Sequence, residues 1–196
     1  MINCRKIRVS NKDVFRFALS LNSNIDLKGK LDVLVDFRSS DKYFNHRELA
    51  RKYINIPMSD VGIKYRNDIL ADTNDLLYFY IEIVDTYRAA FKALIDLVNN
   101  NTSIGIGCYF GKDRTGIATY LIGRKYGVPW PLIESDYEES ESEIMNNIDS
   151  LSYHWKKKGL SKDSYEKRMR CPGHVLVALE TYICRIYGSV ENYLSG

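Results

Sequence analysis

The stretch from Ser103 to Tyr126 constrains the fold of this chain more than any other part of the sequence. An apolar run leads into Cys108, a short loop with Gly111 follows, and apolar residues then recur at helical spacing. This order predicts a β-strand, a tight turn and an amphipathic helix. Such units build α/β proteins, in which the loops at the carboxyl ends of the strands bind ligands.

Two further segments predict strands of the same sheet. Residues 31–37 form an apolar, β-branched run, as in a buried parallel strand. Residues 53–56 predict a second strand, which Pro57 ends. The apolar periodicity of residues 74–99 predicts one long crossover helix from this strand to the third strand, residues 103–107.

The second half of the chain predicts mainly helices. Helical patterns run through residues 117–126, 131–147 and 174–187, and a short final element covers 190–194. The acidic stretch within the second of these helices is typical of a solvated face. Residues 153–170 are basic and polar, which is also typical of a solvated surface; a lid or a recruiting surface for anionic substrates is the alternative.

These elements predict an α/β fold with a central, mostly parallel sheet flanked by helices. Residues 14–19 fit either a short strand or a helical turn, so the contribution of the N-terminal segment stays open. No repeat, linker or low-complexity segment divides the chain. We therefore expect a single domain over its whole length.

The composition restricts the classes of protein to which the chain can belong. Hydrophobic residues make up 45% and charged residues 27%, as in globular rather than disordered proteins. The net charge of +3 gives no reason to expect nucleic acid as a partner. No apolar run reaches the roughly 18 residues of a membrane span, and the first residues lack the apolar core of a secretory signal. We expect no integral membrane segment and a cytoplasmic location, with export by another route left open.

The four cysteines, Cys4, Cys108, Cys171 and Cys184, form no CxxC pair. Free thiols in a reducing compartment are therefore expected. The fragment from Cys171 to His174 is half of a zinc site at best, and a packed cysteine beside a turn is the better interpretation. We expect no metal and no cofactor.

The loop from Cys108 to Gly116 carries the residue types of an oxyanion site. Gly111 and Gly116 permit a tight turn, so that backbone N–H groups can converge on one point. The helix that follows adds the positive end of its dipole, and Arg114 brings a planar fork suited to two phosphate oxygens. A thiol at Cys108 ionises more readily in that field than a free thiol does. The pattern indicates a nucleophile beneath a pocket for a dianion.

Phosphoryl transfer follows from these residue types. The thiolate attacks phosphorus in line, Arg114 and the loop amides hold the equatorial oxygens, and Thr115 offers its hydroxyl to the sulfur. An acid protonates the leaving oxygen and then acts as a base on water. The alternative is a buried cysteine in an ordinary strand–loop–helix junction. Such a junction would not favour the charges of Lys112, Asp113 and Arg114.

The residues from Cys108 to Gly116 resemble the CxxGKDRTG loop of the bacterial tyrosine/serine protein phosphatases. That family belongs to the cysteine-dependent phosphatases and includes members active on phosphoinositides. Residues 35–39 resemble the DLRS strand end of the family, and residues 53–57 resemble its second strand. Asp136-Tyr137 resembles a DY pair, and residues 187–194 resemble the ending YGSVENYL. The resemblance implies the cysteine-dependent phosphatase fold and a phosphomonoesterase that needs no metal.

The resemblance also implies roles for individual residues. Cys108 is the nucleophile and Arg114 is the phosphate clamp. Asp113 is the general acid, with Asp60 on the loop after the second strand as the alternative. Lys112 is placed to bind additional negative charge, including that of an inositol head group. The residues expected to contact the substrate are Tyr109, Phe110, Gly111, Lys112 and Gly116.

The sequence departs from the family beside the nucleophile. Gly107 stands where a histidine is usual. Phe110 stands where a small residue is usual, so that its ring either narrows the pocket or supplies a stacking wall for an aromatic substrate. We expect Asp36 and Arg38 to form an internal ion pair that supports the loop.

Three functional hypotheses follow. The first is a phosphatase that forms a cysteinyl-phosphate intermediate and acts on phosphotyrosine in proteins, with phosphoserine and phosphothreonine as further candidates, or on phosphoinositides. The second is a catalytically impaired phosphate-binding module, a pseudophosphatase, given Gly107 and Phe110. The third is a rhodanese-type sulfurtransferase, which the positions of Arg114 and Thr115 disfavour.

Overall fold

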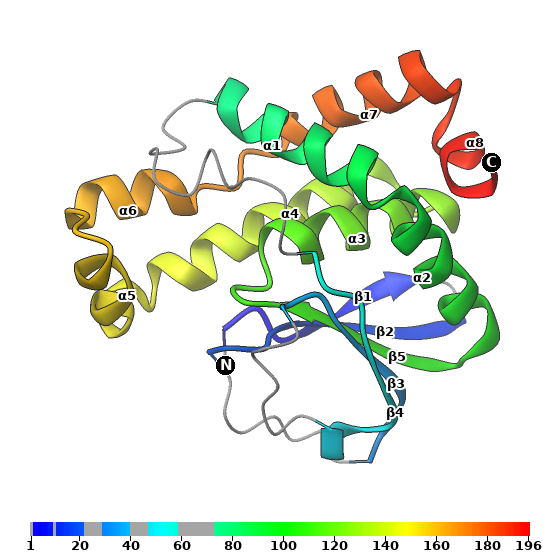
Figure 1. The fold of residues 1–196 in the computed structure, drawn as a ribbon, viewed down its shortest axis with the longest axis horizontal. Coiled ribbons are helices and arrows are strands. Elements are labelled where there is room, and N and C mark those ends of the chain that lie inside the picture. Colours follow the sequence, from blue (N-terminus) through cyan, green and yellow to red (C-terminus); the bar gives the residue numbers. More distant parts are fainter. Residues whose placement is uncertain (1, 10, 22–28, 40–46, 59–72) are drawn as a thin grey trace.

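A five-stranded sheet forms the centre of the molecule (Figure 1). The computed structural model describes residues 2–9, 11–21, 29–39, 47–58 and 73–196. The strand order is β1-β2-β5-β3-β4, with β1 antiparallel to β2 and the other neighbours parallel. The strands are β1 (Arg5–Val9), β2 (Lys12–Ala18), β3 (Leu31–Asp36), β4 (Ala50–Asn55) and β5 (Ser103–Cys108). The expected α/β fold with a mostly parallel central sheet is confirmed.

The predicted strands are present with small shifts at their ends. β3 and β5 are buried almost throughout, which is why their sequences are continuous apolar runs. Val33 and Val35 of β3 face the large core, whereas Leu34 faces a smaller cluster on the other side of the sheet. Residues 14–19, which fit a strand or a helical turn, fall largely within β2.

Eight α-helices accompany the sheet in the described ranges, and most of them lie on one side of it (Figure 1). None of these helices is both long and apolar enough to cross a bilayer. The helices predicted after the loop, over residues 131–147 and over 174–187 are all present, and the short final element over 190–194 is a helix. The helices are α1 (Thr73–Thr86), α2 (Arg88–Asn100), α3 (Asp113–Lys125), α4 (Trp130–Met145), α5 (Ser152–Lys157), α6 (Lys162–Met169), α7 (His174–Tyr187) and α8 (Val190–Ser195), with 3-10 turns η2 (Arg47–Leu49) and η3 (Ile148–Leu151).

The prediction of one helix over residues 74–99 is wrong, because the chain forms α1 and α2, which meet at Tyr87. Tyr87 has φ −110° and ψ 25°, outside the helical range. Backbone hydrogen bonds from Tyr87 to Ile83 and from Phe91 to Tyr87 continue across the bend. The apolar periodicity therefore continues as well, and the sequence shows no break. The bend lets α1 pack on α7 while α2 packs on the sheet and α8.

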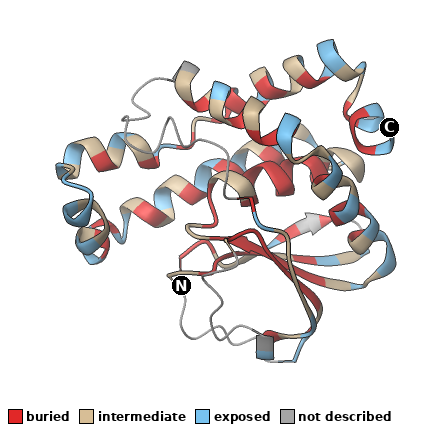
Figure 2. Cartoon of the chain, viewed as in Figure 1, coloured by how far each residue is buried: buried red, intermediate tan, exposed pale blue. Residues whose placement is uncertain are grey.

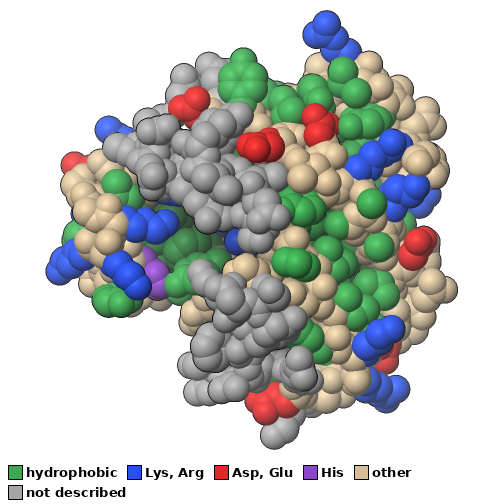
Figure 3. Space-filling view, in the orientation of Figure 1, with side chains coloured by type: hydrophobic (Ala, Val, Ile, Leu, Met, Phe, Trp, Pro, Cys, Tyr) green, Lys and Arg blue, Asp and Glu red, His purple; other side chains and the backbone are tan. Residues whose placement is uncertain are grey.

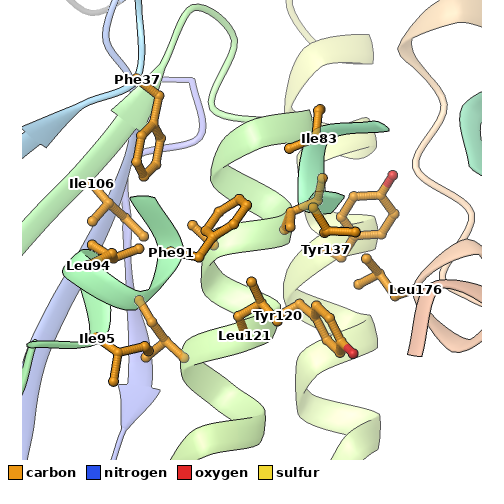
Figure 4. Packing of buried hydrophobic residues seen from close by; sticks show 14 of the residues in the cluster. Phe37, Ile83, Phe91, Leu94, Ile95, Ile106, Tyr120, Leu121, Tyr137 and Leu176 are labelled. Carbon is orange, nitrogen blue, oxygen red and sulfur yellow. The ribbon is translucent and has the colours of Figure 1, made fainter. Parts of the chain in front are cut away.

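The main core lies between the sheet and the helices. Figure 4 shows Phe37 and Ile106 on the sheet side, with Phe91 of α2 and Leu121 of α3 packed near them. Buried residues concentrate along this layer in Figure 2. The close packing makes the sheet and α3 a rigid support for the loop that joins them.

A second, smaller core joins the end of α4 to α5 and α6, which project beyond the sheet (Figure 1). Ile144 and Ile148 pack there with Tyr165 and Met169. Phe110, from the loop after β5, packs against the same cluster. The basic segment predicted to be a surface is thus two short helices, and Phe110 of the loop contacts His154 of α5 and Tyr165 of α6.

Candidate active site

Cys108 ends the central strand of the sheet. β5 lies between β2 and β3, and Cys108 pairs in register with Ala18. Its carbonyl accepts a hydrogen bond from the N–H of Leu19 at 2.9 Å, and its side chain is buried. The sheet therefore fixes this cysteine at the carboxyl edge of the strands, where α/β proteins bind their ligands.

The loop that follows turns the chain back into α3. Gly111 has φ +65°, and a Cβ atom there would lie only 2.7 Å from the carbonyl oxygen of Phe17, so this turn requires glycine. Within the described ranges, the N–H groups of Phe110, Gly111 and Lys112 donate no hydrogen bond. Successive amides without an acceptor on one tight turn are the groups from which an anion-binding nest is built.

α3 begins at Asp113, so the positive end of its dipole adjoins the loop. Thr115 is fully buried, and its Oγ1 has no hydrogen-bond partner among the described residues, the Cys108 sulfur included. Gly116 is buried against α4, where a Cβ atom would lie 2.9 Å from the ring of Tyr137. This glycine therefore permits the close approach of α3 to α4.

Arg114 lies across the carboxyl edge of the sheet. Its Nη1 donates to the carbonyl of Phe37 at 2.9 Å and to that of Met58 at 3.2 Å. These carbonyls follow β3 and β4, so the arginine ties the loops after three parallel strands together. Among the described residues, Nε and Nη2 make no hydrogen bond, and this is the side of the guanidinium that forms bidentate contacts.

Lys112 is buried, and its ammonium group is engaged inside the protein. Nζ donates to Asp113 Oδ1 at 2.7 Å and to the carbonyl of Arg170 at 3.1 Å. Burial alone would lower the pKa of Lys112, but the neighbouring Asp113 carboxylate outweighs it, so that the pKa is raised. The charge expected to bind substrate is thus shared with Asp113.

The Asp113 carboxylate has two partners on one oxygen. Besides Lys112, the hydroxyl of Tyr80 donates to Oδ1 at 2.8 Å, and Tyr80 in turn lies 2.6 Å from the hydroxyl of Tyr137. Burial raises the pKa of Asp113, but the charge and hydrogen bond of Lys112 and the hydrogen bond of Tyr80 outweigh it, so that the pKa is lowered. The side chain is 26% exposed, so the second oxygen can face a ligand.

Most of the chain matches one known protein family. A family model described as "Tyrosine phosphatase family" matches residues 24–196. The chain belongs to the tyrosine phosphatase family. No curated protein matches it. Membership supports a phosphatase activity and implies a phosphorylated substrate.

The loop that follows Cys108 carries an aromatic wall, which Tyr109 and Phe110 form with rings of α5 and α6. The rings of Tyr109 and Phe110 meet edge to face with 4.8 Å between centroids, and Phe110 packs edge to face on Tyr165. The Tyr109 hydroxyl lies 3.1 Å from His154 Nδ1. Burial lowers the pKa of His154, and Lys158 and Lys157 lower it further, so the ring is neutral at neutral pH. Figure 3 shows a hollow on this face, lined by hydrophobic side chains with basic and histidine side chains beside it.

The space beside Gly107 is filled. A Cβ atom at Gly107 would lie 2.5 Å from Leu19 Cγ and 3.0 Å from the carbonyl oxygen of Phe17. Leu19 therefore occupies the space that a larger residue before the cysteine would need.

The Gly107→Ala variant of the phosphatase is expected to lose about 1–3 kcal/mol of unfolding free energy, because the added methyl group overpacks this space. Urea denaturation measures the loss. Leu19→Ala removes the side chain in the way, so the double variant should lose less than the sum of the two single variants. Additive losses would contradict this explanation.

The expected ion pair between Asp36 and Arg38 is present. Arg38 Nη2 donates to Asp36 Oδ2 at 2.7 Å, and both side chains are buried. The Tyr53 hydroxyl donates to the same oxygen at 2.7 Å, and Asn55 donates to the carbonyl of Arg38 at 2.9 Å. The pair orders the chain after β3 and β4, beside Arg114.

Some sequence expectations fall elsewhere. Asp60, the alternative acid, lies outside the described residues.

The sequence analysis did not identify Tyr80 and His154 as residues near the loop. Tyr80 fitted the apolar face of its helix, and His154 stood alone in a basic segment. No local pattern could have identified them, since each is joined to the loop only by folding.

Proposed function

We propose that this phosphatase is a metal-independent phosphomonoesterase that acts through a cysteinyl-phosphate on Cys108. In the first step the thiolate forms an S–P bond, the P–O bond of the ester breaks, and the leaving oxygen takes a proton from an acid. In the second step water attacks phosphorus, the S–P bond breaks, and the same group takes the proton of the water. Phosphate and free enzyme result.

The free amides of Phe110, Gly111 and Lys112 on the loop that starts at Cys108 carry this proposal. They match what a phosphoryl group needs, namely donors fixed before the charge develops. The start of α3 adds its dipole, and Nε and Nη2 of Arg114 add a fork for two oxygens. The loop, helix and arginine can supply the positive charge of the site.

We assign the acid and base to Asp113. Its lowered pKa makes it a carboxylate in the free protein at neutral pH, which suits the base of the second step. The first step requires the protonated form of Asp113, which donates the proton to the leaving oxygen. Turnover of substrates with a poor leaving group should therefore rise as the pH falls toward this lowered pKa.

The Tyr80→Phe variant should move that pH dependence upward. Removing the Tyr80 hydroxyl removes one cause that lowers the pKa of Asp113, so the acid stays protonated to higher pH. The fall of kcat with rising pH, measured on a substrate with a poor leaving group, should occur at higher pH than in the unaltered chain. Tyr137→Phe keeps the hydrogen bond between Tyr80 and Asp113 and serves as the control. If kcat of Tyr80→Phe falls at the same pH as in the unaltered chain, or at a lower pH, this hydrogen bond does not lower the pKa of Asp113.

Asp60 remains the competing acid, and leaving-group dependence distinguishes the two. Asp113→Asn is expected to lower the rate by about 10²–10⁴-fold on an alkyl phosphate and much less on para-nitrophenyl phosphate, whose leaving group needs little protonation. Asp60→Asn, tested beside it, should show no such trend. If the trend appears in Asp60→Asn instead, Asp113 is not the acid.

The aromatic wall favours phosphotyrosine in proteins as the substrate. Tyr109, Phe110 and His154 offer ring edges and faces to an aromatic leaving group. The ammonium of Lys112, which would bind further phosphates of an inositol head group, is engaged by Asp113 and by the carbonyl of Arg170. Phosphotyrosine peptides should be turned over with higher kcat/KM than phosphoserine peptides or phosphoinositides. A panel of the three classes measures this order, and a preference for phosphoinositides would reverse the assignment.

A phosphate-binding protein without turnover is the second candidate. The ionised state of Asp113 favours it, because a carboxylate cannot protonate the leaving group. Hydrolysis of para-nitrophenyl phosphate in excess EDTA tests both candidates. Hydrolysis that survives the chelator supports the enzyme. Tight phosphate binding without any turnover would refute the enzyme hypothesis and support the phosphate-binding protein.

The cytoplasm is the proposed location. All four cysteines are free, as expected in a reducing compartment.

A further inference from the structure

Two buried polar side chains from the start of the chain hold the outer side of the loop after Cys108. Asn3 Nδ2 donates to the carbonyl oxygen of Phe110 at 2.8 Å. Arg16 Nη2 donates to the carbonyl oxygen of Gly111, the next carbonyl along the loop. Both side chains belong to fully buried residues. Two consecutive peptide groups of the loop are thus fixed from the β1–β2 side.

The direction of these carbonyls sets the direction of the amides. In a trans peptide group the C=O and the following N–H point in opposite directions. The hydrogen bond from Asn3 to Phe110 therefore turns the N–H of Gly111 away from Asn3. The hydrogen bond from Arg16 to Gly111 likewise turns the N–H of Lys112 away from Arg16. These are two of the three loop amides that have no acceptor among the described residues.

We propose that Asn3 and Arg16 are positioning residues, which aim the amides of Gly111 and Lys112 at the bound phosphoryl group. The inference rests on the proposed function, because it assigns the amides their ligand. Neither side chain touches the substrate; each acts through a loop carbonyl.

Helix α4 holds the two positioning residues in place. Asp136 binds Arg16 Nη1, and the Ser140 hydroxyl accepts from Arg16 Nη2 at 2.8 Å. Glu143 accepts from the backbone N–H of Asn3. The three α4 residues are spaced at four and three positions and so share one face of the helix. The acidic stretch that looked like a solvated face therefore turns three of its polar groups inward.

Arg5 links the two halves of this arrangement. Its Nη1 donates to Asn3 Oδ1 at 3.1 Å, and its Nε donates to Asp136 Oδ1 at 2.9 Å. Asn3 and Arg16 are thus members of one hydrogen-bonded network rather than two separate contacts. Such a network has one arrangement that satisfies most of its members, so the loop carbonyls are held in a defined direction.

Packing alone does not account for an arginine at position 16. Its neighbours on the same face of β2 are Val14 and Ala18, which are buried apolar residues. Arg16 Nε is buried without a hydrogen-bond partner among the described residues. A buried guanidinium with an unused donor is costly, and an apolar residue would pack there without that cost. An apolar residue could supply neither the contact with Gly111 nor the contacts with Asp136 and Ser140.

Binding of inorganic phosphate, followed by ¹H–¹⁵N NMR, tests the proposal without requiring turnover. Asn3→Asp keeps the acceptor for Arg5 and loses the donor to Phe110, and Arg16→Lys keeps the charge and loses the fork. Each folded variant is expected to bind phosphate about 10- to 100-fold more weakly, with a comparable loss of kcat/KM. The shifts that phosphate induces in the amides of Gly111 and Lys112 should shrink as well. Glu139→Gln, which alters a partner of Arg5 that touches no loop carbonyl, is the matched control and should bind normally.

The outcomes separate this inference from the proposed function. If the unaltered chain neither binds phosphate nor hydrolyses para-nitrophenyl phosphate, the proposed function fails. If the unaltered chain does both, but Asn3→Asp binds phosphate normally with unchanged amide shifts, the positioning role is overturned. Thermal unfolding verifies that each variant is folded. Should Arg16→Lys not fold, Asn3→Asp alone decides.

Discussion

The Cys108→Ser variant is expected to hydrolyse para-nitrophenyl phosphate at least about 10⁴-fold more slowly than the unaltered chain. A serine hydroxyl is a much weaker nucleophile than a thiolate, so the attack on phosphorus is lost. The exchange of sulfur for oxygen is small, and the backbone of Cys108 stays held in the sheet. The variant should therefore remain folded and still bind phosphate. Initial rates and phosphate titrations measure the two properties.

Cys184→Ser is the control for this result. Cys184 is exposed on α7 and has no part in the site, so full activity is expected. Cys171 offers no second nucleophile, because burial raises its pKa to about 12 and keeps it a thiol at neutral pH. Activity that persists in Cys108→Ser would mean that another group attacks phosphorus.

Arg114→Lys is expected to lower kcat/KM by about 10²–10⁴-fold. Nη1 of Arg114 donates to the carbonyls of Phe37 and Met58, which leaves Nε and Nη2 to donate to two oxygens of the phosphoryl group. A lysine has one nitrogen, so it cannot hold the two loops and the substrate together. The loss should appear mainly in kcat, since the equatorial oxygens gain charge in the transition state.

A second arginine of the same helix provides the control. Arg124 donates to Glu180 at 2.9 Å near the other end of α3, and Arg124→Lys should leave kcat/KM unchanged. Thermal unfolding of both variants shows how much of any loss is structural. If Arg114→Lys is destabilised but keeps its kcat/KM, this arginine only fastens the loops.

Much of the site could be predicted because it is local in sequence. The strand that ends at Cys108, the turn at Gly111 and the helix with Arg114 follow one another directly, and each has its own signal in spacing and residue type. The ion pair of Asp36 and Arg38 was predictable for the same reason, since its members are two residues apart.

The rest depends on contacts that only the fold creates. Arg16 and Gly111 are 95 residues apart, and Asn3 and Phe110 are 107 residues apart. Tyr80 has the same apolar spacing whether or not its hydroxyl meets Asp113. The engagement of Lys112 by the carbonyl of Arg170 likewise depends on how the segment after α6 returns to the loop. Periodicity indicates which face of an element is buried, but not which polar group of another element contacts that face.

Trapping the covalent intermediate tests the central claim most directly. The protein, with Asp113→Ala to slow the second step, is mixed with para-nitrophenyl phosphate, quenched in acid, digested and analysed by mass spectrometry. A phosphoryl group is predicted on the peptide that contains Cys108, and none is predicted when Cys108→Ser is added. A phosphoryl group on any other residue, or turnover with no phosphorylated peptide at all, would contradict the mechanism.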